Sequence, residues 1–589
     1  MKRTLLTLGA FSLVGLAAVA CSLTERTEDV VSAAKRPATK EVRAPKEVMP
    51  APTIMEQEID RAEAWVQQPL STLQLADAVD FHGRHALGIA PTDHVNPIVQ
   101  PFPEDRERYQ DTDPNPVKLV SAEPVSTFSI DVDTASYANV RRFLKDGQLP
   151  PIDAVRVEEL INYFDYAYET PADAAKPFAA DIALFTSPWD TGSQLLRIGL
   201  KGYEIGAAGR PPANLVFLVD TSGSMDSPDK LPLLKRSLGM LVEQMRPEDR
   251  IAIVAYAGSA GIVLEPTAGA DKAEITRAIE TFRAGGSTAG AEGIRQAYQL
   301  AEAGFDEAAI NRVILATDGD FNVGVSDPDR LEDFIAAKRE TGVYLSILGF
   351  GRGNLNDLLM QKLAQAGNGN ASYIDSLMEA RKVLVEEIGS TLFPIADDVK
   401  VQIEFNPEKV AEYRLIGYET RMLKREDFNN DQIDAGEIGS GHTVTALYEI
   451  TPPDSPSRLV DDLRYGVQPA SLERSASAPR PAGASDEIAW LRLRYKRPGE
   501  DKSRLIERPV PAVMETAFED AAEEARFAAA VAGFGQILRQ SVHVGRFDFD
   551  AVLKIARSAR GEDPFGYRAE FLQLVSLAKS ARALQPVGG

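Results

Sequence analysis

A middle block of the chain, from about residue 212 to 392, alternates apolar strands with amphipathic helices. Stretches such as "NLVFLVD", "RIAIVAYAG", "RVILATDGD" and "VYLSILGFG" are nearly continuous runs of apolar residues. The first helix between them has one apolar face, formed by Leu231, Leu234, Leu238, Leu241 and Met245. Continuous apolar strands separated by such helices are typical of a parallel sheet covered on both faces. The block therefore predicts an α/β domain.

The segments on either side of this block follow the two-residue alternation of antiparallel strands. "ADIALFTSPW" and "QLLRIGLKGYEI" precede the block, and "DVKVQIEF", "HTVTALYEI" and "AWLRLRYK" follow it. Strands with one buried face on both sides of an α/β block favour a single β-sandwich-like unit, into which the α/β domain is inserted. Two separate β units are the alternative.

Helical spacing appears before and after these strands. One predicted helix begins near Ala135, a second follows near Val157, and residues 511–589 form a C-terminal helical region. Asp131 and Asp133 come just before the first helix. We expect them to cap its N-terminus, because carboxylates accept hydrogen bonds from the first helical N–H groups; a cation site is the alternative.

The N-terminus has the charge pattern of a signal peptide. In "MKRTLLTLGAFSLVGLAAVAC" two basic residues precede an uncharged, mainly apolar run, and Cys21 is the only cysteine of the chain. The small residues before Cys21 resemble the lipobox of bacterial lipoproteins, which implies lipidation of this cysteine, for example by palmitate. The residue after this cysteine is Ser22 rather than an aspartate, which resembles Gram-negative lipoproteins that are sorted to the outer membrane. An ordinary cleaved signal peptide is the alternative.

These patterns predict six segments. They are a signal peptide (1–20), a flexible tether rich in Pro and charge (21–120), an N-terminal helical and strand region (121–211), the α/β domain (212–392), a β-rich domain (393–510) and the C-terminal helical region (511–589). Such a protein would sit in the cell envelope and contact the membrane only through its N-terminal lipid.

Charge narrows the range of partners. The formal net charge is −23 and the pI is about 4.9. Nucleic acid is not expected as a partner, because phosphate binding requires a basic face. Cations remain candidate ligands.

Polar side chains gather where the strands of the predicted α/β domain end. Asp220, Ser222 and Ser224 follow the first strand, Thr288 lies in "GGSTAG" ahead of a helix, and Asp318 follows a later strand. Because parallel strands place their carboxyl ends at one edge of a sheet, all five are expected to meet there. Hydroxyl and carboxylate oxygens suit a hard cation, Mg²⁺ or else Mn²⁺ or Ca²⁺, and disfavour zinc and copper.

D-x-S-x-S, a later threonine and T-D-G, in this order, resemble the metal-ion-dependent adhesion site (MIDAS) of von Willebrand factor type A (VWA) domains. From about Asp111 onward the chain is similar to bacterial lipoproteins that carry this domain with N- and C-terminal flanking domains. The resemblance implies a Rossmann-like sheet with helices on both faces.

The resemblance also implies a role for each site residue. Ser222 and Ser224 would bind the metal directly, and Thr288 directly or through water, with Ser287 as the alternative to Thr288. Asp220 and Asp318 would act largely through coordinated water. An acidic side chain of a protein partner would then complete the coordination, in adhesion or another protein–protein interaction.

Catalysis is not expected, and neither catalytic nor cofactor-binding residues are assigned. None of the five histidines falls in the α/β domain, and the sequence contains no G-x-S-x-G, Walker A or H-E-x-x-H motif. Two alternatives stay open: a Mg²⁺-dependent hydrolase in which the Asp220 and Asp318 pair activates water, and a structural scaffold with a non-functional metal site.

Overall fold

The structure is a computed structural model. It describes residues 107–584 apart from 131–132, 173, 289, 320–327, 434, 462–485, 501 and 513–514. The predicted signal peptide, Cys21 and the predicted tether as far as residue 106 lie outside the described residues. The described residues all belong to one structural unit.

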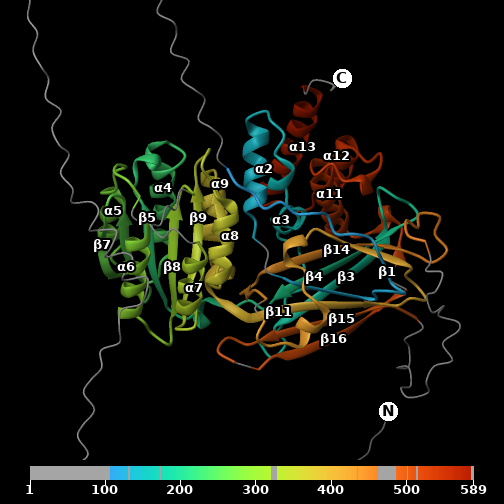
Figure 1. The fold of residues 1–589 in the computed structure, drawn as a ribbon, viewed down its shortest axis with the longest axis horizontal. Coiled ribbons are helices and arrows are strands. Elements are labelled where there is room, and N and C mark those ends of the chain that lie inside the picture. Colours follow the sequence, from blue (N-terminus) through green and yellow to red (C-terminus); the bar gives the residue numbers. More distant parts are fainter. Residues whose placement is uncertain are drawn as a thin grey trace, which may run out of the picture. The chain divides into compact units, whose positions relative to one another are not determined.

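The middle of the chain forms a six-stranded sheet with helices on both faces (Figure 1). In order across the sheet, the strands are β10 (Ala371–Ile374), β9 (Val343–Phe350), β8 (Ile310–Thr317), β5 (Ala213–Asp220), β6 (Arg250–Tyr256) and β7 (Ala260–Ala268). All neighbours are parallel except β6 and β7. The predicted α/β domain is confirmed.

Two groups of helices cover this sheet. One face packs against α4 (Leu231–Gln244), α5 (Lys272–Glu280), α9 (Leu377–Arg381) and α10 (Ile388–Leu392). The other face packs against α6 (Gly290–Ala303), α7 (Pro328–Arg339) and α8 (Asp357–Ala366). The central strand β5 is buried along its whole length, which explains its unbroken apolar run.

The edge strand β7 is not among the strands predicted from the sequence. It pairs antiparallel with β6, and its side chains are mostly half-buried or exposed. Glu265 and Pro266 interrupt its apolar residues. An edge strand has one free side, so its pattern lacks the continuous apolar run that marks the central strands.

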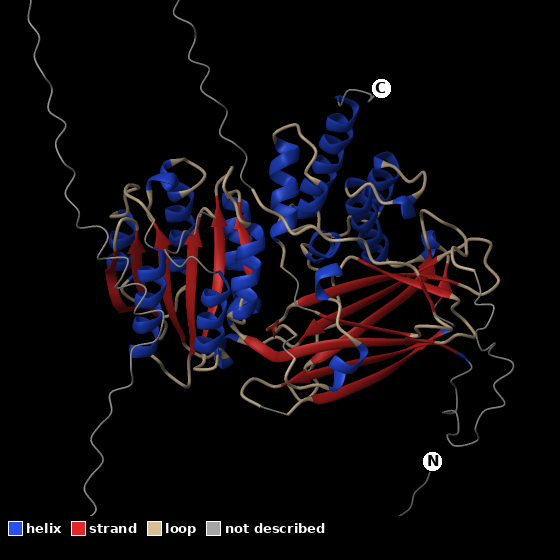
Figure 2. Cartoon of the chain, in the orientation of Figure 1, coloured by secondary structure: helices blue, strands red, loops and turns tan. Residues whose placement is uncertain are grey.

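Strands from both flanks of the α/β domain form one β-sandwich, as predicted. Its first sheet contains, in order, β1 (Lys118–Leu119), β12 (Glu412–Ile416), β14 (Thr443–Thr451), β4 (Gln194–Gly202), β3 (Phe178–Thr186) and β17 (Glu515–Thr516). Its second sheet contains β13 (Ile438–Gly439), β11 (Pro394–Phe405), β15 (Glu487–Lys496) and β16 (Arg504–Pro511), with β2 (Val125–Ser129) also pairing with β11. The decisive pairing is β4 with β14, because it joins strands from before and after the inserted domain. Figure 2 shows the sandwich strands apart from those of the α/β domain.

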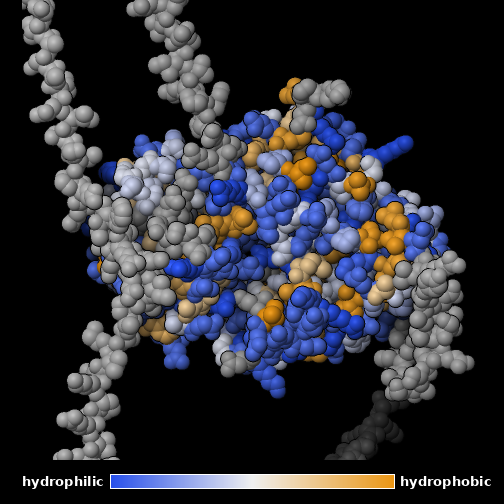
Figure 3. Space-filling model, viewed as in Figure 1, coloured by the Kyte–Doolittle hydropathy of each residue, from blue (hydrophilic) through white to orange (hydrophobic). Residues whose placement is uncertain are grey.

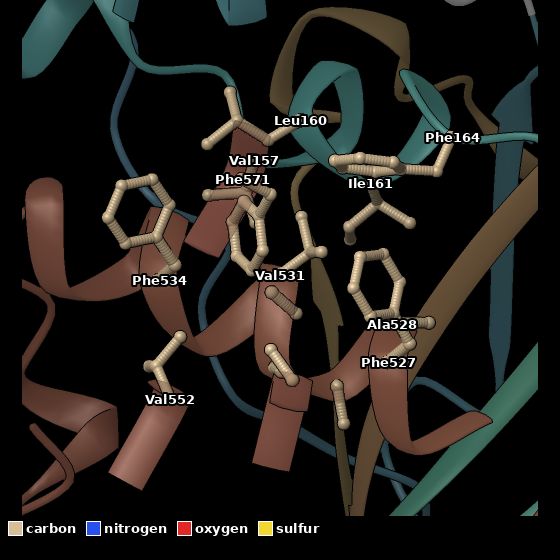
Figure 4. Close-up of a cluster of buried hydrophobic side chains, with 14 of the residues drawn as sticks. Val157, Leu160, Ile161, Phe164, Phe527, Ala528, Val531, Phe534, Val552 and Phe571 are labelled. Carbon is tan, nitrogen blue, oxygen red and sulfur yellow. The ribbon is translucent and has the colours of Figure 1, made fainter. Parts of the chain in front are cut away.

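A bundle of helices lies against the first sheet of the sandwich. It consists of α2 (Ala135–Lys145), α3 (Val157–Asn162), α11 (Glu523–Leu538), α12 (Phe549–Ser558) and α13 (Tyr567–Leu584). Its core combines aliphatic and aromatic side chains, with Phe164 edge-on to Phe527 at 5.0 Å and Phe534 edge-on to Phe571 at 5.3 Å between ring centroids (Figure 4). Among the helices of the described residues, none combines the length and apolar character needed to cross a bilayer.

The structure corrects one local prediction and shifts a boundary. The N-cap residue of α2, Thr134, makes no side-chain capping bond, and the Asp133 carboxylate instead accepts from the Ala371 N–H at 2.9 Å. The capping prediction is therefore wrong for Asp133, whose carboxylate is recruited by the α/β domain; Asp131 lies outside the described residues. Packing also begins before the predicted end of the tether at residue 120, since Glu107 already pairs with Arg142 at 2.6 Å.

Candidate functional site

The candidate site lies where β5 and β8 end. The two strands are adjacent and parallel, with Val219 opposite Ala316. Asp220 is the last residue of β5, and Asp318 directly follows β8. The strand register therefore places the two carboxylates side by side at the edge of the sheet.

Asp220 is completely buried, and both of its carboxylate oxygens accept hydrogen bonds. One carboxylate oxygen, Oδ1, accepts from the Ser222 N–H at 2.8 Å. The other, Oδ2, accepts from the Tyr256 hydroxyl at 3.1 Å and the Thr317 hydroxyl at 3.4 Å. Neutral donors satisfy this carboxylate as a hydrogen-bond acceptor without neutralising its charge.

The two serines face each other in the turn after β5. Their hydroxyl oxygens are 3.0 Å apart, and the Ser224 hydroxyl is among the groups that lower the pKa of the Asp318 carboxylate. Ser222 is buried, whereas Ser224 is exposed. The structure thus brings four of the five predicted residues together, around a point that opens to solvent at Ser224.

The fifth predicted residue, Thr288, lies in a loop that is fastened to this turn. The Gly223 N–H donates to the Gly286 carbonyl at 3.1 Å, and the Gly285 N–H donates to the Thr221 carbonyl at 2.9 Å. Thr288 follows two residues later and is half-buried. Within the part of the chain that the structure describes, its hydroxyl makes no hydrogen bond to the other four predicted residues. The loop is therefore in place, but the Thr288 side chain is not shown to join the cluster.

The two carboxylates have opposite pKa shifts. Burial raises the pKa of Asp220 from 3.8 to about 6, and the nearby charge of Asp318 adds to this shift against the hydrogen bonds from Ser222. Burial also acts to raise the pKa of Asp318. The hydrogen bond and charge of Lys230 outweigh that effect, so the pKa of Asp318 is lowered. One carboxylate of the pair is thus charge-compensated and the other is not.

Lys230, which the sequence interpretation missed, belongs to the site. Its ammonium Nζ donates to Asp318 Oδ2 at 2.9 Å and to the Asn354 side-chain oxygen at 3.1 Å, and the residue is 7% exposed. It occupies the N-cap of α4. A cation is unfavourable at that end of a helix, so a lysine just before an apolar helix face was a signal that a nearby acid compensates it.

The donor set fits a hard divalent cation. A buried carboxylate with a raised pKa and two hydroxyl oxygens 3.0 Å apart offer oxygen ligands and negative charge to a cation entering beside Ser224. Within the described residues, no three His, Cys, Asp or Glu side chains form a group able to hold a metal ion. Any metal here would depend on hydroxyls and water for its remaining ligands, which favours Mg²⁺ or Mn²⁺ over zinc.

Comparison with protein families identifies the class of protein. The model for the von Willebrand factor type A domain matches residues 214–387, and a model described as von Willebrand factor matches residues 103–197. The chain is therefore a VWA-domain protein, and the site occupies the sheet edge where the sequence resemblance placed the MIDAS.

A relative that matches most of both chains identifies the particular family. The chain is 47% identical over 477 residues to the uncharacterized protein YfbK of Escherichia coli (strain K12), across 80% of this chain and 81% of that protein. The model for the C-terminal part of YfbK matches residues 390–581. The chain belongs to the YfbK family.

Solved structures show more distant likeness. A von Willebrand factor type A protein from Catenulispora acidiphila is 16% identical, with a TM-score of 0.36, over 67% of this chain and 89% of that one. Proximal thread matrix protein 1 from the mussel byssus, with a zinc-occupied MIDAS motif, is 24% identical, with a TM-score of 0.26, over 30% of this chain and 45% of that one. The assignment to the VWA class rests on the family models.

Proposed function

We propose that this protein binds a divalent cation, most readily Mg²⁺, at the edge of its VWA sheet and uses it to hold an acidic group of a protein partner. Ser222, Ser224 and Thr288 would contact the cation, and Asp220 and Asp318 would hold its water ligands. When bound, the cation supplies a coordination position for the partner's carboxylate. The role is recognition rather than catalysis.

One observation carries this proposal: four side chains from two strand ends converge on a solvent-open point. Ser224 is exposed above a completely buried Asp220, so a cation could meet both the protein and an external ligand. The face drawn in Figure 3 is mostly hydrophilic, with hydrophobic residues in small scattered groups.

We propose further that the chain is anchored to the cell envelope, in the outer membrane, through lipid on Cys21. The sequence pattern around this cysteine supports the proposal. Metabolic labelling with a palmitate analogue tests it: wild-type protein should incorporate label, and Cys21→Ser should not. Label retained by Cys21→Ser would refute lipidation at this residue.

Isothermal calorimetry with Mg²⁺ and Mn²⁺ tests the metal site. Asp220→Ala should weaken binding by about 10–100-fold, because the carboxylate orients the ligands around the cation. Asp226→Ala is the matched control, since this acid is exposed in the same turn, and it should bind as wild type does. If the wild-type protein binds neither Mg²⁺ nor Mn²⁺, the proposal is wrong and the protein is a structural scaffold with a non-functional metal site.

Partner capture tests the second half of the proposal. When mild crosslinking is carried out in Mg²⁺ or in EDTA, a partner should co-purify with wild-type protein from the Mg²⁺ sample but not from the EDTA sample, and not with Asp220→Ala or Thr288→Ala. Equal recovery from all samples would show that recognition uses another surface. Mg²⁺-dependent phosphatase or nuclease turnover that Asp220→Ala abolishes would favour the hydrolase instead.

A further inference from the structure

Lys230 brings a fixed positive charge into the candidate metal site. Its ammonium lies 2.9 Å from Asp318 Oδ2, and the side chain of Asp318 is fully buried. Asp220, which ends the neighbouring strand, has only neutral donors among its hydrogen bonds. Lys230 therefore compensates the negative charge of Asp318 but not that of Asp220.

The position of this ammonium is set by packing rather than by chance. A Cβ added at Gly351 would clash with the Cγ, Cδ and Cε atoms of Lys230, and Gly351 has φ +77°, which favours glycine. The backbone thus leaves a groove for the lysine stem. Asn354, three residues further on, accepts from the ammonium at 3.1 Å. The β9–α8 loop and Asp318 therefore both hold Lys230 in place.

Lys230 changes the net charge of the site when a divalent cation is bound, which is called the loaded site below. With both carboxylates ionised, Asp220, Asp318 and Lys230 together carry one net negative charge, and a divalent cation would make the set net positive by one. Without Lys230 the loaded set would be neutral. A nearby ammonium repels an incoming cation but attracts an incoming anion, and both effects are strong at a partly buried site.

We propose that Lys230 sets the ligand specificity of this site: it weakens metal binding and, in return, makes the loaded site select an anionic carboxylate over a neutral oxygen ligand. This inference rests on the proposed function and refines it. The partner would present the side chain of an Asp or Glu, or a free C-terminal carboxylate, rather than an amide, a hydroxyl or a backbone carbonyl.

Two opposite changes in one variant test the proposal. In Lys230→Met, calorimetry should find Mn²⁺ bound about tenfold more tightly than in wild type, because the repulsion is gone. The Mn²⁺-loaded variant should at the same time bind acetate more weakly. Water-proton relaxation of bound Mn²⁺ reports acetate, which displaces a coordinated water, and acetamide serves as the neutral probe of the same shape.

Controls separate charge from structure. Lys230→Arg keeps the charge and should keep the preference for acetate over acetamide. Lys272→Met removes an equal charge from an exposed ion pair on α5 and should change neither affinity. Lys230→Gln replaces Lys230→Met if thermal unfolding shows that the methionine variant does not fold.

The outcomes distinguish this inference from the proposed function. The inference alone is overturned if the wild-type protein binds Mn²⁺ and a folded Lys230→Met variant binds it equally tightly or less tightly. It is also overturned if Lys230→Met keeps the wild-type preference for acetate over acetamide. Uptake by Lys230→Met but not by wild type supports the role of Lys230 and overturns the proposed function for the native protein. No uptake by either protein overturns both.

Discussion

At the residue scale, Asp220 should make the stability of the metal-free protein depend on pH. Its folded-state pKa of about 6 lies above the ordinary 3.8, so the folded state holds this proton more tightly than the unfolded state does. The resulting stability is fully present below about pH 4 and is lost as pH rises through about 6, with a total change of about 3 kcal/mol. Urea unfolding in EDTA between pH 4 and pH 7.5 measures it.

Asp220→Asn tests the assignment of this pH dependence. The amide cannot ionise, so the loss of stability between pH 4 and pH 6 should shrink, and Mg²⁺ should no longer stabilise the protein at pH 7.5. Asp226→Asn, in the exposed part of the same turn, should retain both behaviours. An unchanged pH profile in Asp220→Asn would assign the titration to another group.

The sequence predicts the members of the site better than their environment. Asp220, Ser222, Ser224 and Asp318 stand directly at strand ends, where the edge of a parallel sheet must bring them together. Lys230 is ten residues away from Asp220 in the sequence and reaches Asp318 only through the path of the turn that leads into α4. No short motif encodes that approach, and the charge state of the site therefore required the structure.

At the element scale, the β9–α8 loop should be intolerant of a side chain at one glycine and tolerant at another. Gly351 and Gly353 have φ of +77° and +85°, but an added Cβ would strike Lys230 only at Gly351. Strain alone should make Gly353→Ala less stable by about 1 kcal/mol, whereas Gly351→Ala should lose about 2–4 kcal/mol. Urea unfolding of both variants measures the difference, and equal losses would show that Lys230 is not confined there.

Strands buried on both faces could be predicted from their own apolar residues. An edge strand and a helix start whose interactions depend on residues far away in the sequence could not. β5 reads as a strand because every one of its residues is buried. β7, at the sheet edge, does not. The prediction for the start of α2 was wrong because a backbone N–H of its first turn bonds an acid that is distant in the sequence. The Ser136 N–H donates to Glu159 Oε2 at 2.8 Å. Capping rules describe local chemistry and miss such partners.

At the scale of the whole described unit, Arg141 ties the helical bundle to the VWA domain. This fully buried guanidinium, on α2, bonds Asp375 at 2.8 Å and Glu379 at 2.6 Å in the VWA domain, and Glu570 at 3.2 Å on α13. Arg141→Leu would leave these carboxylates buried without their cation and should cost about 3–5 kcal/mol. Calorimetric unfolding should then separate into two transitions, because the tie between the modules is lost.

Lys145→Met is the matched control for this prediction. Lys145 pairs with the same Glu570 at 2.8 Å, but its side chain is 47% exposed. Removing such a surface pair should cost less than about 1 kcal/mol and leave a single transition. A small effect in both variants would mean that packing alone holds the modules together.

The insertion of the VWA domain into a β-sandwich could be predicted, because alternating strands on both flanks need a common core. The pairing of β4 with β14 confirms it. The residue at which folded structure begins could not be predicted, since the segment from Glu107 to Val117 has the composition of a linker and is held by scattered polar contacts before β1 begins. The Glu107 carboxylate, for example, accepts from the Gly353 N–H at 3.0 Å, on the loop that also bonds Lys230.

A crystal of the wild-type protein soaked in Mn²⁺, with anomalous diffraction recorded at the manganese edge, tests whether the edge of the VWA sheet binds a divalent cation. We expect one strong anomalous peak in contact with Ser222 Oγ and Ser224 Oγ, beside the Asp220 carboxylate, and its loss in Asp220→Ala. A peak at a different place in the VWA domain, or no peak at a Mn²⁺ concentration that saturates solution binding, would contradict it.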